Sequence, residues 1–192
     1  MSPFSKLISY FRGSPASPDL QPTLEGDLVA LRPVRPDDWE EMFAVASDPL
    51  IWEVHPERDR WQEPIFRLFF DGAVESVSAL AILDRGSGRI IGSSRYFGHD
   101  AELSEIEIGW TFLARPYWGG AVNREVKRLM LDHAFTFVDT VIFWVGENNQ
   151  RSRRAMEKIG GILRDEIRMR AYSWGVCPHV VYEIRRPHGL AE

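Results

Sequence analysis

Cysteine is almost absent from this chain of 192 residues, in which Cys177 is the only one. A single thiol excludes an intrachain disulfide and predicts a reducing compartment, the cytoplasm. Long apolar runs are also missing, since none approaches the ~20 residues that a membrane-spanning helix needs. Basic residues are in deficit, with 23 Lys and Arg against 28 Asp and Glu. The net charge of -5 argues against a general nucleic-acid-binding protein and is compatible with a cationic or amine partner.

Several catalytic and ligand-binding motifs are missing as well. The chain has no G-x-x-x-x-G-K-[ST] stretch for nucleotide phosphates and no G-x-S-x-G turn of the serine hydrolases. Its histidines have no H-E-x-x-H or other paired-ligand spacing; they are His55, His99, His133, His179 and His188. We therefore predict no metal site, a core position for His133 and a structural role for Cys177.

The composition that is present suits one folded domain. Hydrophobic residues make up 44% of the chain, which is enough to bury a full core at this length. A Ser-Pro-rich linker around Pro15 and Pro18 indicates a flexible segment over residues 1–22. We predict one domain over residues 23–187 and a C-terminal tail over residues 188–192.

Hydrophobic periodicity predicts a mixed α/β domain, with a central mixed twisted sheet of about seven strands flanked by about four helices. The expected order is β-α-α-β-β-β-α-β-α-β-β, with βαβ units in the second half. Strands are expected at residues 28–33, 77–83, 90–97, from 105 to the break at Arg115-Pro116, and at 141–145, 162–169 and 180–184. Helices are expected to begin at Asp37 (with capping-box spacing to Glu40), at Pro64, after the turn that ends at Ala121, and before Ala155. Residues 174–178 are expected to form a loop.

The stretch from Glu105 to Lys127 organises the rest of the chain. Glu105 and Glu107 alternate with two isoleucines, which is the pattern of a half-buried strand, and Gly109 indicates a bulge. Small residues after Trp118 then lead into a helix. Free backbone N–H groups at such a helix start bind phosphate, and the helix dipole favours the anion. From the glycines alone, an ordinary strand-to-helix turn is the simpler interpretation.

Four short motifs, in order and on the expected elements, resemble the GNAT superfamily of N-acetyltransferases. They are Ile90-Ile91-Gly92, Glu107-Ile108-Gly109-Trp110, Tyr117-Trp118-Gly119-Gly120, and Asn149-Gln150-Arg151-Ser152 with its continuation to Glu157-Lys158-Ile159-Gly160. The resemblance covers residues 24–186 and is strongest to the branch of ribosomal-protein N-terminal (alanine/serine) acetyltransferases. It implies an acyltransferase that uses acetyl-CoA as cosubstrate.

The resemblance also implies where coenzyme A binds. Backbone groups of Trp110, Thr111 and Phe112 would pair with the pantetheine arm as an added strand, because the central strand separates there from the strand at residues 141–145. The diphosphate would lie on the following turn and on the start of the next helix. The residues implied there are Trp118, Gly119, Gly120, Ala121, Val122, Asn123, Asn149 and Ser152.

This loop departs from the family pattern Gln/Arg-x-x-Gly-x-Gly/Ala at Trp118, Ala121 and Asn123. The β-carbon of Ala121 is harmful only if that position needs a positive φ. Nearby, the basic side chains of Arg124, Lys127 and Arg128 have two equally good interpretations, a solvated helix face or contact with phosphate.

Acetylation of an amine needs a group that removes a proton from the attacking nitrogen. Glu107 is the candidate base, since the branch places an acidic residue beside the thioester, and Glu105 is interpreted as a surface carboxylate. Ser152 is the candidate donor that stabilises the leaving thiolate, with a helix cap as its structural alternative. Tyr172 is a second candidate for this donor.

The connection between the first two helices, with the loop over residues 172–178 opposite it, is expected to shape the amine site. Its candidates are Trp52, Glu53, His55, Trp61 and Tyr172. Aromatic walls around the Glu53 carboxylate would hold an ammonium group by cation–π contact and charge. For Trp52 an equally good interpretation is that the indole anchors a long loop on the core.

Three functions follow from the resemblance. The first is acetylation of a protein or peptide N-terminal α-amine, the second is acetylation of a small amine such as an aminoglycoside or polyamine, and the third is a non-catalytic acyl-CoA-binding module. A transferase is expected to act by direct attack of the amine in a ternary complex. An acidic cleft near Glu53, Glu57 and Asp59 would favour a polycation, an open groove would favour a peptide, and a blocked pantetheine cleft would favour the third function. We expect no direct nucleic-acid partner and no membrane span, and the sequence leaves a monomer and a homodimer open.

Overall fold

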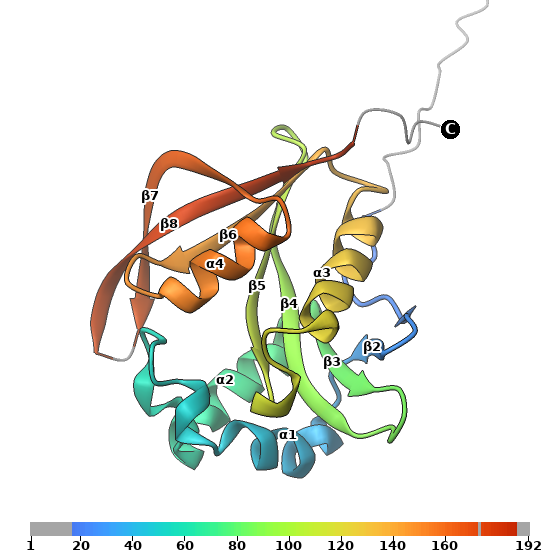
Figure 1. Cartoon of the computed structure of the whole chain (residues 1–192), viewed down its shortest axis with the longest axis vertical. Helices are drawn as coiled ribbons and strands as arrows, with labels where there is room; N and C mark the ends of the chain where they lie inside the picture. The colour runs from blue at the N-terminus through green and yellow to red at the C-terminus, as the bar shows by residue number, and fades with distance from the viewer. Residues whose placement is uncertain (1–16, 173, 188–192) are drawn as a thin grey trace, which may run out of the picture.

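The computed structural model describes residues 17–172 and 174–187, which build one mixed eight-stranded sheet in the order β1-β2-β3-β4-β5-β6-β8-β7 (Figure 1). The strands are β1 (Leu24–Glu25), β2 (Val29–Pro33), β3 (Ala79–Asp84), β4 (Ile90–Asp100), β5 (Glu105–Leu113), β6 (Thr140–Gly146), β7 (Ile162–Tyr172) and β8 (Gly175–Arg185). Neighbouring strands are antiparallel except β5 and β6, which are parallel. The predicted mixed α/β fold is confirmed; the additional strand is β1, whose two residues are too few to give a period.

Four α-helices and four short 3-10 turns complete the described fold. The helices are α1 (Trp39–Ala46), α2 (Glu63–Glu75), α3 (Ala121–Ala134) and α4 (Gln150–Lys158). The turns are η1 (Pro36–Asp38), η2 (Pro49–Ile51), η3 (Arg58–Trp61) and η4 (Arg115–Tyr117). No helix in residues 17–172 and 174–187 is long and apolar enough to cross a membrane.

The sheet is covered on both faces, and alternation along β3 divides the core in two. Leu80 and Ile82 join the cluster that packs against α3 and α4, whereas Ala79 and Ala81 join the cluster formed with α1 and α2. Because side chains of a strand alternate between the faces of a sheet, β3 supplies both clusters at once. The small alanine side chains leave room for the aromatic rings of α1 and α2.

The first α-helix begins two residues later than predicted. Pro36 opens η1, and the carboxylate of Asp38, not Asp37, accepts a hydrogen bond from the backbone N–H of Arg35 at 2.8 Å. Arg32 donates to both oxygens of Asp38, at 2.7 and 2.8 Å. The capping-box spacing correctly located a helix start but assigned it to the wrong carboxylate, and α1 itself starts at Trp39.

The central strand β5 has the predicted bulge. Its pairing with β4 shifts between Arg95, opposite Gly109, and Ser93, opposite Phe112, so β5 has one residue more than β4 at this point. Trp110 absorbs the extra residue with a φ of 52°. Pairing of β5 with β6 covers only three residues, from Glu105 to Glu107. Beyond them the two strands separate, which confirms the predicted split and leaves the edge of β5 unpaired.

Gly92 in β4 explains one of the sequence motifs. A β-carbon at this residue would lie 2.1 Å from the backbone oxygen of Phe112, a contact that no side chain permits. A glycine is therefore required for β4 and β5 to approach each other beside the bulge.

Two expectations for the second half of the chain are wrong. Most of the predicted loop at residues 174–178 belongs to β8, which begins at Gly175, so β7 and β8 form a long hairpin. In addition, β5 is not half-buried, because the side chains of β7 cover it: Glu105 is 7% exposed and Glu107 is 2% exposed. Glu105 is thus no surface carboxylate, and its Oε2 contacts the guanidinium of Arg164 at 2.5 Å.

The chain before β1 packs on the domain as far as it is described. Leu20 lies against the cluster of α3, and the backbone oxygen of Asp19 is 2.7 Å from Nε2 of His133. His133 is half-buried rather than a full core residue. Residues 1–16 of the predicted flexible segment and the predicted tail at residues 188–192 lie outside the described residues.

Candidate functional site

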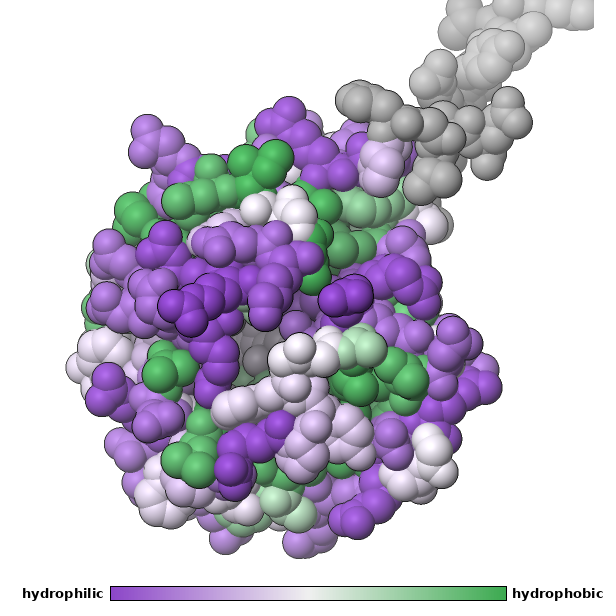
Figure 2. Space-filling model, in the orientation of Figure 1, coloured by the Kyte–Doolittle hydropathy of each residue, from purple (hydrophilic) through white to green (hydrophobic). Residues whose placement is uncertain are grey.

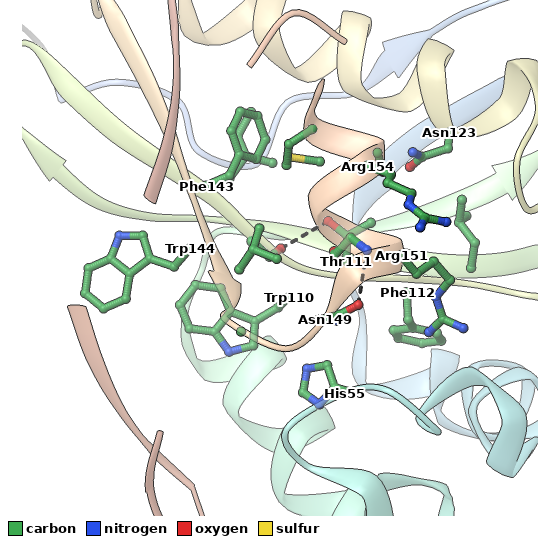
Figure 3. Close-up of a pocket in the computed structure, with 18 of the residues that line it drawn as sticks. His55, Trp110, Thr111, Phe112, Asn123, Phe143, Trp144, Asn149, Arg151 and Arg154 are labelled. Atoms are coloured by element: carbon green, nitrogen blue, oxygen red, sulfur yellow. Dashed lines mark hydrogen bonds between the residues drawn. The ribbon is translucent and has the colours of Figure 1, made fainter. Parts of the chain in front are cut away.

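A cavity of about 520 Å³ passes through the sheet where β5 and β6 separate. Figure 2 shows a hollow near the middle of this face, bordered by strongly hydrophilic side chains over α4. Most of the predicted site residues line the cavity: Trp52, His55, Trp110, Thr111, Phe112, Trp118, Gly119, Gly120, Asn123, Asn149, Ser152 and Tyr172. Figure 3 shows Asn123, Arg151 and Arg154 on one side and Trp110, Trp144 and His55 on the other.

One end of the cavity, here the helix end, is formed by the starts of α3 and α4. Gly119 has a φ of 68°, which glycine adopts without strain, and the extended Gly120 precedes the first helical residue, Ala121. Ala121 is not among the described residues with positive φ, so its β-carbon causes no backbone strain. Basic side chains also line this end; they are Arg124, Arg151, Arg154 and Lys158. Free N–H groups, a helix dipole and several cations together suit a diphosphate.

Trp118 and Arg151 connect the two helix starts. The indole of Trp118 donates to the backbone oxygen of Leu113 at 2.7 Å, and the guanidinium of Arg151 lies 4.1 Å from the ring centroid. Arg151 also donates to the backbone oxygen of Ile51 at 2.7 Å. A tryptophan is therefore used here as a packing and cation–π surface, where the family pattern has a polar side chain.

Asn149, rather than Ser152, caps the start of α4. The side-chain oxygen of Asn149 accepts a hydrogen bond from the backbone N–H of Ser152 at 3.1 Å, so Asn149 is the cap. Both residues line the cavity. In the described part of the chain the hydroxyl of Ser152 has no hydrogen-bond partner, which leaves it available to a ligand.

Lys127 lies in the floor of the cavity and not on a solvated helix face, one of the two interpretations of the sequence. It is 3% exposed, and its Nζ donates to Oγ1 of Thr111 at 2.7 Å. Burial lowers the pKa of this amine to about 7, against a smaller opposing effect of Glu107. The bulge places the Thr111 hydroxyl toward α3, so the sequence pattern of α3 alone did not predict this contact.

The opposite end of the cavity, here the hairpin end, is lined by His55, Arg60, Arg170, Tyr172 and His179. Nδ1 of His179 lies 3.0 Å from the backbone oxygen of Cys177, an atom that can only accept, so the ring proton is on Nδ1. Nε2 then accepts from the hydroxyl of Tyr172 at 2.7 Å. Burial raises the pKa of Tyr172 to about 12 and lowers the pKa of His179. A neutral histidine therefore accepts a hydrogen bond from the hydroxyl of a tyrosine that lines the cavity.

Glu107 lies beside the cavity, and no part of it lines the wall. Nη2 of Arg170 contacts both carboxylate oxygens, at 2.7 and 2.8 Å. Burial raises the pKa of Glu107, and the neighbouring Arg170 only partly offsets that rise. An added β-carbon at Gly109 would lie only 2.7 Å from Oε1 of Glu107, so the glycine leaves room for this buried carboxylate beside the bulge.

Four other predicted residues do not line the cavity: Glu53, Trp61, Ala121 and Val122. Glu53 and Trp61 are exposed on the outer side of the connection between α1 and α2. Trp52 is only 2% exposed and its indole donates to the backbone oxygen of Ala46, so it anchors the connection as well as lining the cavity. A second cavity of about 430 Å³ adjoins the first and includes Glu57 and Asp59.

Arg60, Arg170 and His179 line the cavity but were not predicted as site residues. Arg60 lies in η3, in the connection that was expected to shape the site, but charge alone did not distinguish it from Arg58. Arg170 and His179 lie on β7 and β8, and only the pairing of these strands brings them together. The expected loop at residues 174–178 concealed that pairing.

The whole arrangement suits a long ligand that has a diphosphate at the helix end and an amide-containing arm in the split of the sheet. Comparison with known proteins agrees. The family model described as "Acetyltransferase (GNAT) domain" matches residues 29–162. A provisionally named acetyltransferase from T. thermophilus is 27% identical, with a TM-score of 0.70 over 85% of this chain and 88% of that chain.

Two further solved structures share the fold at lower identity. A GCN5-related N-acetyltransferase from Brucella melitensis is 20% identical, with a TM-score of 0.71 over 86% of this chain and 79% of that chain. A protein from Vibrio cholerae, provisionally named a ribosomal-protein-serine acetyltransferase, is 11% identical, with a TM-score of 0.68 over 85% and 97%. The family model matches well over half of this chain, which therefore belongs to the GNAT acetyltransferases. These are acyltransferases that use acetyl-CoA as cosubstrate.

Proposed function

We propose that this enzyme transfers an acetyl group from acetyl-CoA to a primary amine inside the cavity. One observation carries the proposal: the cavity is continuous from the helix end, which suits a diphosphate, to the hairpin end, which holds titratable groups. The unpaired edge at Trp110, Thr111 and Phe112 offers backbone groups to the pantetheine amides between the two ends. The open split argues against the non-catalytic alternative, for which a blocked cleft was the expected sign.

In the proposed reaction the neutral amine attacks the carbonyl carbon of the thioester in one ternary complex. The C–N bond forms, the C–S bond then breaks, and the proton lost by the nitrogen is gained by the sulfur of the leaving thiolate. Ser152, whose hydroxyl at the helix end has no hydrogen-bond partner among the described residues, is proposed to contact coenzyme A. Asn149 is proposed to hold that helix start in place through its cap.

Glu107 and Tyr172 are the two candidates that could receive the proton of the amine. Glu107 is the base proposed from the sequence, but both of its oxygens contact Arg170. Tyr172 lines the cavity and already donates a hydrogen bond to His179, so we propose that the proton passes through Tyr172. The Tyr172 oxygen takes the proton of the amine while its own proton moves to Nε2 of His179. The reverse movement delivers a proton to the thiolate and restores the pair.

The acceptor is proposed to be a small amine. The indole of Trp174 donates to the backbone oxygen of Pro56 at 2.9 Å, which joins the β7–β8 hairpin to the connection between α1 and α2 across the hairpin end. This bridge restricts a groove that an extended peptide would need. A protein N-terminal α-amine is the second candidate, because the adjoining cavity of about 430 Å³ extends the hairpin end and shares His55, Pro56, Gly146 and Asn149 with the main cavity. Its wall includes Glu57 and Asp59, which were expected to favour a polycation, but Arg58 lies between them and Glu53 is not part of the wall.

A thermal shift with coenzyme A tests the cofactor side of the proposal. A ligand at 100 times its Kd stabilises the native state by about 2.7 kcal/mol. For a chain of this size we expect a rise in Tm of about 5–10 °C. Gly120→Asp should abolish the rise, since it adds a carboxylate to the diphosphate site.

Gly120 is a clean position for this test. Its φ is −115°, and the nearest atom to an added β-carbon is the backbone oxygen of Trp118 at 3.8 Å, so the variant should fold. Gly120→Ala is the matched control and should keep the shift. Release of free thiol from acetyl-CoA in the presence of amines then measures turnover. A folded wild-type protein with no shift at millimolar coenzyme A and no thiol release would contradict the proposed function.

A further inference from the structure

Two hydrogen-bond donors face each other at the hairpin end. Nδ1 of His55 accepts from the backbone N–H of Glu57 at 2.9 Å, so this nitrogen has no proton. Burial holds the pKa of His55 well below its usual range, so the ring is neutral and its one proton is on Nε2. That N–H points at Nη1 of Arg60, 3.3 Å away, and Arg60 is also a donor. Two donors at this separation repel each other unless an acceptor lies beside both.

No such acceptor belongs to the part of the chain that the structure describes. Among residues 17–172 and 174–187, no oxygen accepts a hydrogen bond from the Arg60 guanidinium, which packs on aromatic rings instead, 5.1 Å from the centroid of Trp52 and 4.7 Å from that of Phe69. Glu57 attracts this cation through space, and burial lowers the pKa of Arg60 to about 10. Within the described residues, a side chain that is 9% exposed thus carries a charge without a hydrogen-bonded counter-ion.

The neighbouring groups have the same shortage of acceptors. Behind the cavity wall Arg95 is 8% exposed, and its Nε has no hydrogen-bond partner among the described residues. The indole nitrogen of Trp144, a lining residue near Arg170, is likewise buried and unpartnered there. Arg60, Arg95 and Arg170 alternate with the rings of Phe69 and Trp110, and the guanidiniums repel one another. Of these three arginines in the described chain, only Arg170 has a hydrogen-bonded carboxylate, that of Glu107.

We infer that the acceptor amine carries an anionic group, a carboxylate or a phosphate, which is bound between His55 and Arg60. This inference rests on the proposed function and identifies the class of its amine. One anionic oxygen accepts from both Nε2 of His55 and Nη1 of Arg60, which removes the repulsion between them. Polyamines and aminoglycosides, which carry only positive charge, are disfavoured by the arginines of this end.

A panel of paired acceptors tests the inference, with free thiol released from acetyl-CoA as the readout. The pairs are glycine and glycinamide, L-alanine and L-alaninamide, and O-phosphoethanolamine and ethanolamine, with spermidine as a polycation. Rates are compared at equal concentrations of neutral amine, because the members of a pair differ in amine pKa. We expect a kcat/KM roughly 10–100-fold higher for the anionic member of at least one pair, as for a charge-assisted hydrogen bond. The pair that responds distinguishes carboxylate from phosphate.

Variants of η3 assign the preference to Arg60. Arg60→Met should raise KM for the anionic acceptor by roughly 10–100-fold and leave KM for its neutral partner and for acetyl-CoA unchanged. Arg58→Met is the matched control, because it removes the same charge from an exposed position two residues earlier in the same turn. Arg60→Lys keeps the charge and much of the stem, and it should recover part of the preference if Arg60→Met folds poorly.

A binding experiment decides the case in which no amine of the panel turns over. With the helix end filled by saturating coenzyme A, acetate and inorganic phosphate are compared with chloride at equal ionic strength, and Tm is measured. A rise that depends on Arg60 and not on Arg58 supports the inference. Equal kcat/KM within every pair, a preference for spermidine, or equal responses of the two arginine variants would overturn it. Thiol release with neutral amines would still support acetyl transfer, so the two failures are distinct.

Discussion

Lys127 shows how one buried amine can make stability depend on pH. Its pKa is about 7 in the folded protein, against about 10.5 for an ordinary lysine. Below pH 7 the amine is charged in both states, and the native state has the full cost of burying the charge. Between pH 7 and 10.5 the unfolded chain binds the proton that the native protein has released, so this cost falls as pH rises.

Replacing Lys127 with Met should therefore change the pH dependence of unfolding. We expect the variant to gain stability relative to wild type near pH 6, and this difference should shrink by about 1 kcal/mol per pH unit between pH 7.5 and 9.5. Denaturant melts across this range measure the difference. Lys158→Met, the same change at an exposed lysine, is the control. Parallel stability curves for wild type and Lys127→Met would show that the buried amine does not titrate in this range.

Single substitutions can distinguish Tyr172 from Glu107 as the group that takes the proton of the amine. If Tyr172 transfers the proton, Tyr172→Phe should lower kcat by about 10²-fold with little change in KM for acetyl-CoA. Glu107→Gln should then lower kcat by less than about 10-fold, because Glu107 would only hold Arg170. Since protonated His179 cannot accept, kcat should fall as pH drops through the lowered pKa of His179. The opposite order of the two variants would return the role of base to Glu107.

At the scale of elements, the sequence predicted what depends on short-range pattern. The period of two, the period of 3.6 and the turn glycines located all four helices and the bulge at Gly109. The turn at Gly119 and Gly120 was found for the same reason, since the need for small residues at a helix start is local. A helix boundary was misplaced where two neighbouring residues could both act as the cap, as with Asp37 and Asp38 before α1.

Features that depend on long-range pairing were not predictable in this way. The pairing of β7 with β8 brings His179 near Tyr172, and no periodicity within either strand fixes that register. The contact of Arg170 with Glu107, 63 residues earlier in the chain, in turn joins β7 to β5. Burial of Lys127 and of Glu105 has the same origin, because each is covered by an element distant in sequence. The helix end of the cavity was therefore predictable from short sequence motifs. The hairpin end was not, because its residues come together only when the strands pair.

At the scale of the whole molecule, β7 and β8 form the end of the sheet beyond β6 (Figure 1). Ion pairs join this hairpin to the central strand β5. Nη2 of Arg164 on β7 contacts Glu105 on β5 at 2.5 Å, and its Nε contacts Glu183 on β8 at 2.6 Å. Both carboxylates are 7% exposed. The hairpin carries Tyr172 and Arg170, so the same ion pairs that close the fold also hold one end of the cavity in place.

Arg164→Met should remove this fastening and leave two buried carboxylates with weaker partners. Glu105 would keep Arg168 at 3.8 Å, and Glu183 would keep Arg185 at 2.8 Å. We expect the free energy of unfolding at pH 7 to fall by about 2–4 kcal/mol, somewhat below the cost of breaking a fully buried pair. Arg185→Met is the control, because the side chain of Arg185 is 74% exposed and its pair should contribute at most about 1 kcal/mol.

Acid should reduce the effect of Arg164→Met. Burial raises the pKa of Glu183, but the hydrogen bonds from Arg164 and Arg185 outweigh it, and the pKa lies below its usual range. A carboxylate with a lowered pKa stabilises the native state above the unfolded pKa of about 4.3, and this contribution is lost as pH falls through the folded value. Denaturant melts of wild type and Arg164→Met should therefore converge as pH drops below about 4. A difference that stays constant from pH 7 to pH 3 would mean that Arg164 stabilises the hairpin by packing rather than by charge.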